Sequence, residues 1–351
     1  MKPGLDTVWR NRDTVQIGID PRRAIALTGM RGAAGLLRLL DGSRDRRQVL
    51  AAAGDLGMDA GTADRVLTLL AAAGALDDCP AGGHGALAAG TRARLAPELA
   101  TTSLAHKDAD GGARTLARRQ AALVRVHGAS RASLWIAGLL SAAGVGLVLS
   151  TGPAAPGPAP PRSPDGRRAT PPLADPAPGD SARGDRGPVP PADRPAATAR
   201  GPRRRPRRRP DLVILADSPR RELPAALVSH VVPHLAASAS EAIGVVGPLV
   251  LPGRSACLRC LDLARAERDP AWPLILAQLA GQAAVEPLAC DTVLATTVAA
   301  QAAAQALAFL DQGGKAATAV TNGTLELVLP GWQWHRRTWH PHPRCGCCHR
   351  R

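Results

Sequence analysis

The sequence has no tyrosine, one phenylalanine and six tryptophans among 351 residues. So few aromatic side chains leave few flat surfaces on which unpaired bases could stack, which argues against binding of RNA or single-stranded DNA. Lysine is also scarce, because Lys2, Lys107 and Lys315 are the only three. The formal net charge of +15 therefore comes from arginine, and a single arginine is weak evidence for function in such a composition.

A secretory signal is not evident at the start of the sequence. The first thirteen residues, MKPGLDTVWRNRD, carry charges where a signal peptide needs an apolar core. The run from Ser133 to Ser150 is uncharged and long enough for a membrane helix. However, Gly144-Val145-Gly146 interrupts it and a strand-like run leads into it, which favours a soluble fold. We expect a cytoplasmic protein without membrane contact.

Two cysteine pairs, Cys257-x-x-Cys260 and Cys345-x-x-Cys348, stand far apart in the sequence. Two such turns can supply four thiolates to one tetrahedral zinc ion, and a site closed in this way is structural. Cys347 is an alternative to Cys348, and His340, His342 and His349 are nearby substitutes. A disulfide or free thiols would be the other interpretation, but seven cysteines cannot all pair. The nearby cations favour the thiolate form; they are Arg254, Arg259, Arg344, Arg350 and Arg351.

Residues 153–210 differ from the rest of the chain. Between Thr151 and Pro210 the sequence has 13 arginines, 5 aspartates and 17 of its 32 prolines. Such a composition cannot bury a core, so we expect a disordered insertion that is dispensable for folding. Its end, GPRRRPRRRP, could bind phosphates, although a solvated linker is the simpler interpretation.

Residues 1–80 are expected to form a small winged-helix-like domain, followed by a connector over 81–120. From Thr14, VQIGID and AIALTG alternate like two strands, and the periodicity predicts helices over 30–41, 46–53 and 61–75. Such a domain can place its third helix in a DNA groove, or accept an extended peptide at a strand edge. Arg65 is the only basic residue of that helix, which favours a peptide. A dimerisation or packing domain is the third alternative.

Residues 121–152 and 211–351 are expected to form one α/β core. The first part predicts strand, glycine turn, helix and strand, as at the start of a nucleotide-binding Rossmann-like fold. Gly128 holds the first position of the glycine fingerprint, but Ser130 and Ser133 stand where the second and third glycines belong. No acidic residue follows the second strand to bind a ribose. We therefore expect weak ATP binding or none.

Several segments resemble a known family. They are VWRNRDTVQIGIDPRRAIALTG (8–29), GPLVLPGRSACLRCLDLARAERDPAWP (247–273), AQL (277–279), LAFLD (307–311), NGTLELVLPG (322–331) and HPRCGC (342–347). These are similar to actinobacterial ThiF-like proteins described as cyclodehydratase or leader-peptide-binding partners of YcaO enzymes, which modify ribosomally made peptides. The resemblance to ThiF and MoeB implies a Rossmann-type core and a tetracysteine zinc site, here Cys257, Cys260, Cys345 and Cys348. The same resemblance implies an N-terminal peptide recognition domain.

The hypothesis that follows is a non-catalytic scaffold. It would bind a precursor peptide and present it to a YcaO-type or other modifying enzyme in azole- or thiazoline-type bacteriocin biosynthesis, with a homodimer as a further candidate state. The first alternative is a ThiF-type adenylyltransferase with Cys290 as acyl acceptor, although the apolar neighbours of Cys290 indicate a buried structural thiol. The second alternative is a zinc-containing nucleic-acid-binding protein.

Overall fold

The structure is a computed structural model that describes residues 1–31, 34–78, 89–150, 208–216, 222–280 and 289–348. Almost the whole of the expected Pro/Arg-rich insertion lies outside the described residues. His349, Arg350 and Arg351, considered above beside the cysteines, lie outside them as well.

The N-terminal region combines a small antiparallel sheet with three helices. The strands lie in the order β1-β2-β3 and are β1 (Thr7–Trp9), β2 (Val15–Ile17) and β3 (Ile25–Leu27). The helices are α1 (Ala34–Arg38), α2 (Arg46–Asp55) and α3 (Ala60–Ala72). Asp45 and Gln48 form a capping box at the start of α2, and Asp59 caps α3. The two predicted strands and three helices are present, whereas the sequence analysis missed β1, whose residues are all exposed.

A buried cluster holds these elements together. Val15, Ile17 and Leu27 of the sheet pack with the apolar faces of the helices. The third helix was expected to bury one apolar stripe, and this is confirmed in part, because Ala63, Val66, Leu67 and Leu70 are buried. Leu69 and Ala73, which the stripe also included, are exposed.

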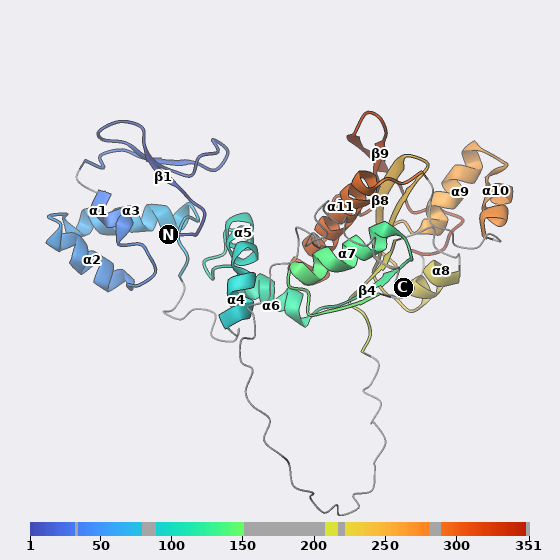
Figure 1. The fold of residues 1–351 in the computed structure, drawn as a ribbon, viewed down its shortest axis with the longest axis horizontal. Coiled ribbons are helices and arrows are strands. Elements are labelled where there is room, and N and C mark those ends of the chain that lie inside the picture. Colours follow the sequence, from blue (N-terminus) through green and yellow to red (C-terminus); the bar gives the residue numbers. More distant parts are fainter. Residues whose placement is uncertain (32–33, 79–88, 151–207, 217–221, 281–288, 349–351) are drawn as a thin grey trace, which may run out of the picture. The chain divides into compact units, whose positions relative to one another are not determined.

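A seven-stranded mixed sheet forms the core of the remaining chain (Figure 1). Its strand order is β10-β9-β8-β7-β6-β4-β5. The strands are β4 (Leu123–His127), β5 (Leu147–Ser150), β6 (Leu212–Leu215), β7 (His234–Ser240), β8 (Ile243–Val250), β9 (Gly323–Val328) and β10 (Gln333–Thr338). The four strands from β7 to β5 run parallel, and β8, β9 and β10 are added antiparallel. The expected mixed α/β core is therefore present.

Two helices cover one face of this sheet and a third lies on the other. Helices α7 (Arg131–Ala142) and α11 (Thr292–Asp311) pack against each other and against the strands (Figure 1). Helix α8 (Glu222–Ser229) packs through Leu227 on Val213 and Leu215 of β6. Because side chains alternate along a strand, this packing assigns Val124 and Val126 of β4 to the α7 face and Arg125 to the opposite face.

Ser133–Ser150 is not a membrane helix, because it divides into most of α7 and the strand β5. The strand, helix and strand order expected for 121–152 is confirmed. By length and composition one described helix, α11, could cross a membrane, but 56% of its tested window is buried inside the protein. Its burial under the sheet explains its apolar composition.

A buried ion pair joins helices that precede and close the core. Helices α4 (Ala89–Arg94), α5 (Ala96–His106) and α6 (Ala113–Ala121) come before β4. Arg119 of α6 donates to both carboxylate oxygens of Asp311, over 2.7 and 2.8 Å, and to Glu98 of α5 over 2.8 Å. It also donates to the carbonyl of Ala143 at the end of α7. One guanidinium thus connects α5, α6, α7 and α11.

Because β4 lies between the parallel strands β5 and β6, the insertion between them cannot simply be deleted. The insertion must join the carboxyl end of β5 to the amino end of β6, with β4 between them. Ser150 is level with Val126 and Leu212 with Val124, so these two strand ends are about 12 Å apart in a straight line that runs through β4. A plain deletion of 153–210 leaves three residues, which reach about 14 Å and leave almost no length for a path around β4.

We predict that a Gly/Ser linker of about 15 residues in place of 153–207 keeps the fold, since closure entropy changes slowly with loop length. The unfolding free energy, measured by urea denaturation followed by circular dichroism, should change by no more than about 1 kcal/mol. Loss of soluble protein would mean that these residues belong to the core.

Candidate metal centre and nucleotide loop

The cysteines meet where helix α9 (Leu258–Arg268) begins. Cys257 is the N-cap residue of α9 and Cys260 lies in its first turn, so both side chains leave the same end of the helix. The C-terminal tail returns beside them and contributes Cys345 and Cys347. Gly346 between them has a positive φ of 70°, which turns the chain so that both thiols reach the same place.

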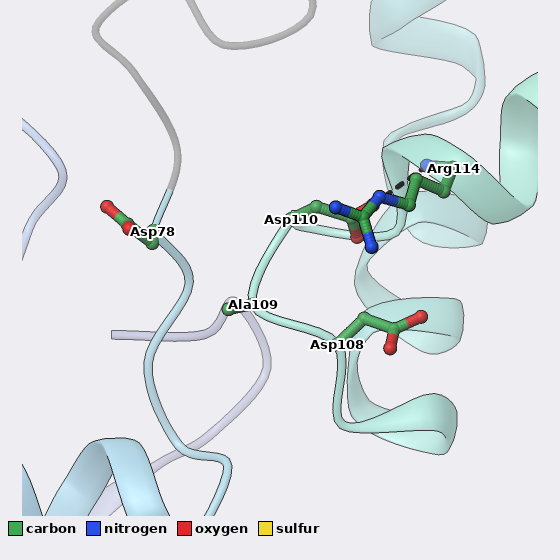
Figure 2. Close-up of a pocket in the computed structure, with 5 residues that line it drawn as sticks. All are labelled: Asp78, Asp108, Ala109, Asp110 and Arg114. Carbon is green, nitrogen blue, oxygen red and sulfur yellow. Dashed lines mark hydrogen bonds and ion pairs between the residues drawn. The ribbon is translucent and has the colours of Figure 1, made fainter.

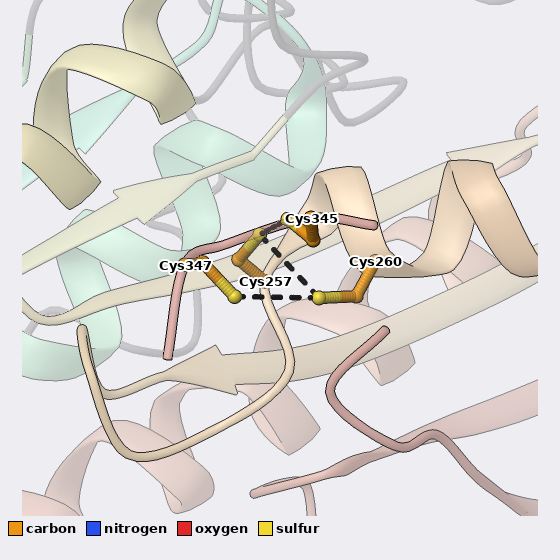
Figure 3. Close-up of side chains that lie close together, drawn as sticks. All are labelled: Cys257, Cys260, Cys345 and Cys347. Carbon is orange, nitrogen blue, oxygen red and sulfur yellow. Dashed lines mark hydrogen bonds between the residues drawn. The ribbon is translucent and has the colours of Figure 1, made fainter. Parts of the chain in front are cut away.

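Four thiols lie at distances that suit one tetrahedral metal ion. The sulfur atoms of Cys257, Cys260, Cys345 and Cys347 lie within 4.8 Å of one another (Figure 3). Their close pairs are 3.8 Å for Cys257 to Cys260, and 3.4 Å for both Cys257 to Cys345 and Cys260 to Cys347. Zinc bonded to four sulfurs at about 2.3 Å requires sulfur separations of about 3.8 Å. The cluster therefore fits zinc after a small adjustment.

The position of Cys348 differs from the expected one. The two-residue spacer predicted Cys348 as the fourth ligand, whereas the structure brings Cys347 into the cluster. The Cys348 thiol lies 3.6 Å from the Cys347 sulfur and donates to the carbonyl of Ser255. The left-handed turn at Gly346 shortens the spacer that is needed, and this property was not evident in the sequence.

The electrostatics of the cluster favour a thiolate at Cys260. Its sulfur accepts a hydrogen bond from the Cys257 thiol and another from the His342 backbone N–H at 3.3 Å. The first of these bonds is the main reason why the pKa of Cys260 falls to about 4. Donating the same bond, together with burial, raises the pKa of Cys257. A metal ion would replace these shared protons and stabilise thiolates at all four positions.

His342 orients the tail and is not part of the thiol cluster. Its Nδ1 accepts from the Arg344 backbone N–H at 3.2 Å, so the ring carries its proton on Nε2 and donates to Glu267 at 2.9 Å. Arg344 also donates to Glu267, over 3.0 Å. These bonds fasten the tail to α9 beside the cysteines. His342 was a predicted substitute ligand, whereas Glu267 was not predicted, because no spacing pattern identifies it.

Two tryptophans and one arginine support the other side of the cluster. Trp339 is buried among the cysteines and donates from its indole N–H to Thr324 at 3.0 Å. The Arg265 guanidinium lies 5.4 Å from the Trp339 ring and 5.0 Å from the ring of Trp272. These cation–π contacts connect the tail with α9 and with α10 (Trp272–Ala280).

The loop after β4, considered above as a degenerate nucleotide loop, lies at the carboxyl end of the parallel strands, where open α/β sheets bind ligands. Gly128 follows β4, and the loops after β4 and β6 meet at the point where helices change face. Ser130 caps α7, and its hydroxyl donates to the Ala216 carbonyl after β6. The Ser133 hydroxyl, fully buried, donates to the Ser130 carbonyl. Both serine side chains are thus occupied by protein contacts.

A surface pocket elsewhere does not coincide with any predicted site residue (Figure 2). Asp78, Asp108, Ala109, Asp110 and Arg114 line it. Asp110 accepts from the backbone N–H groups of Gly112 and Arg114, and pairs with the Arg114 side chain. The carboxylate of Asp110 therefore stabilises the local turn. Lys2, one of the three lysines, is buried and paired with Asp77.

Comparison with known proteins identifies similar folds. No family model and no curated protein matches the sequence. A heterocyclase solved in complex with substrate and cofactor matches 99% of this chain with a TM-score of 0.61 and 12% identity. The heterocyclase TruD matches 99% with a TM-score of 0.59 and 15% identity. MccB of E. coli, solved with AMPCPP and MccA, matches 99% with a TM-score of 0.59 and 11% identity.

These likenesses show the fold. The chain covers only 39% of the first heterocyclase and 42% of TruD, so it spans about two fifths of their length. By contrast it covers 98% of the MccB chain. The arrangement of strands and helices is thus shared with two kinds of protein of different size.

We predict one zinc ion per chain, held by the four clustered thiols. Replacing Cys257 and Cys260 by serine should abolish metal content, measured by plasma mass spectrometry, and lower the melting temperature, because structural zinc contributes about 10 kcal/mol or more of binding free energy in small sites. Cys348→Ser is the matched control and should keep the metal. Metal-free wild-type protein whose stability is unchanged by chelator would contradict the prediction.

For the nucleotide loop we predict weak ATP binding or none, because Ser130 and Ser133 close the turn that phosphates approach. Titration calorimetry with Mg²⁺-ATP should show no binding at micromolar concentrations, with MccB as the positive control. Micromolar, magnesium-dependent affinity would show that the loop still works as a nucleotide site.

Proposed function

We propose that this chain is a ThiF-like scaffold that binds a precursor peptide and presents it to a separate modifying enzyme in ribosomal peptide biosynthesis. In this role it performs no ATP chemistry of its own. The observation that carries the proposal is the outer edge of β3, which pairs with no further strand among the described residues. We propose that the N-terminal sheet and helices around it act as a winged-helix-like peptide recognition domain.

The edge of β3 offers backbone groups to another strand. Arg10 donates to Thr14 and Gly18 donates to Asp6 between β1 and β2, so the backbone groups of Thr14, Gln16 and Gly18 point toward β1. Residues at odd positions of β2 therefore bond to β3. Ala26 is opposite Gln16, and by this alternation its N–H and C=O point away from β2. A bound peptide strand can take up both groups.

Helix α3 offers a side-chain surface that suits a peptide. Arg46 of α2 donates to Asp64 and Thr68, which covers one flank of α3. Arg65 and Leu69, one turn apart, are on another flank and are exposed; Leu69 keeps 58% of its surface accessible. We propose that this flank recognises an apolar and an acidic side chain of the peptide.

The matched part of the heterocyclases is compatible with a separate modifying enzyme. The heterocyclases that share the fold have more than half of their chain outside the matched part. We propose that a YcaO-type enzyme supplies the corresponding chemistry to this chain as a second polypeptide. The scaffold role requires no catalytic residue in the chain itself.

An adenylyltransferase remains the alternative, for one specific reason. Gly128 still occupies the switch point of a fold shared with MccB, which has been solved with ATP. Cys290, proposed above as acyl acceptor in this case, is buried at the start of α11. The ATP titration described above separates this function from the scaffold.

We predict that Ala26→Pro weakens peptide binding roughly tenfold by removing one outward N–H donor, a loss of about 1.4 kcal/mol. Ala26→Val keeps the donor and is the matched control. In the same fluorescence-polarisation titration, Arg65→Glu should weaken binding of acidic leader peptides, and less so at high salt. If peptides bind only to a chain fragment without residues 1–80, or if residues 1–80 bind duplex DNA more tightly, the proposed groove is wrong.

A further inference from the structure

Parallel strands are normally covered on both faces of their sheet. Here the α7 face of β4 and β5 is covered, because Val124, Val126 and Val148 pack into the main core. On the other face, Arg125 of β4 is level with Leu149 of β5 and with Val213 of β6. Arg125, Leu147 and Leu149 together are called the β4–β5 face below.

Among the described elements, helix α8 covers only the neighbouring part of this side. It packs on Val213 and Leu215 of β6, whereas β5 packs mainly with β4 and with α7 on the far side. Leu147 is 50% exposed and Leu149 is half-buried. Among the described strands β5 is the last of the sheet, so within the described part of the chain this apolar surface lies at the sheet edge.

Arg125 gives the β4–β5 face a positively charged hydrogen-bond donor. Its side chain is half-buried and its Nε atom is fully buried without a hydrogen-bond partner. No ion pair of Arg125 with a described residue occurs either. A buried N–H group without a hydrogen-bond partner is costly. A carboxylate from outside the described residues would satisfy it, and flanking apolar side chains would cover Leu147 and Leu149.

We propose that the β4–β5 face is the docking surface for the modifying enzyme, which contributes a carboxylate surrounded by apolar side chains. This inference rests on the proposed scaffold function and adds the place of contact. Charge complementarity favours a carboxylate as the partner group of Arg125. The two leucines favour a protein surface over a free inorganic anion, because such an anion would leave them exposed.

The test uses the full chain with its zinc and three variants. Arg125→Glu reverses the charge, and Arg125→Met removes it while keeping the volume, so that the fold is preserved. Arg268→Glu reverses an exposed charge at the end of α9 and is the matched control. The probe is a heterocyclase-type YcaO enzyme without its own ThiF-like part, titrated by biolayer interferometry. Leader-peptide binding and sedimentation velocity are measured on the same samples.

The expected result is a loss of enzyme affinity of at least 30-fold for Arg125→Glu and about tenfold for Arg125→Met. Arg268→Glu should bind within about twofold of wild type, and all variants should bind leader peptide equally. Unchanged enzyme affinity in both Arg125 variants would overturn the docking surface and leave the scaffold intact. If wild type binds peptide but no YcaO enzyme, the partner half of the proposed function fails. A dimer that Arg125→Glu converts to a monomer would assign the β4–β5 face to a second copy instead.

Discussion

The buried guanidinium of Arg119 is the group on which the arrangement of the core helices depends. It is 5% exposed, and its bidentate pair with Asp311 is supported by Glu98 and by the carbonyl of Ala143. Burial opposes its charge, but the bonds to Asp311 and Glu98 outweigh burial and raise its pKa. Removing one partner of such a pair would leave a buried charge, at a cost of about 3–5 kcal/mol. Helices α7 and α11, which cover the sheet and shape the loop after β4, are held at their ends by this pair.

Local patterns in the sequence predicted much of the fold. Alternation and turn residues located β2 and β3, and the apolar stripe located α3 and its buried side. The same reasoning found the strand, turn and helix around Gly128. It missed β1, because Thr7, Val8 and Trp9 are exposed and show no buried face. The length and lack of charge of Ser133–Ser150 were also compatible with a membrane helix. In the structure α7 ends before Gly144, and β5 begins after Gly146. The contact that decides this packs Gly146 against the backbone of Gln120, which no local pattern can show.

The candidate site was predicted in part. The cysteine spacing found three of the four clustered thiols, but the choice between Cys347 and Cys348 depends on the backbone of Gly346. Glu267 meets His342, which lies 75 residues further along the chain, and Trp339 meets Thr324, 15 residues before it. These contacts form only after folding, so no sequence motif predicts that both residues support the tail. The strand order is another long-range property. From it follow the position of β5 at the edge of the described sheet and the unbonded Nε of Arg125, which in sequence is one arginine among many.

The position of Trp339 has a spectroscopic consequence. Because the chain has no tyrosine, its near-ultraviolet emission comes almost entirely from six tryptophans. Trp339, at 4% exposure, is the buried one among them in the described part of the chain, and it packs on the cysteine cluster. Its indole is therefore in an apolar environment next to polarisable sulfur and under the guanidinium of Arg265. A blue-shifted, sulfur-quenched component of the emission would thus report whether the tail is seated, without any label attached to the protein.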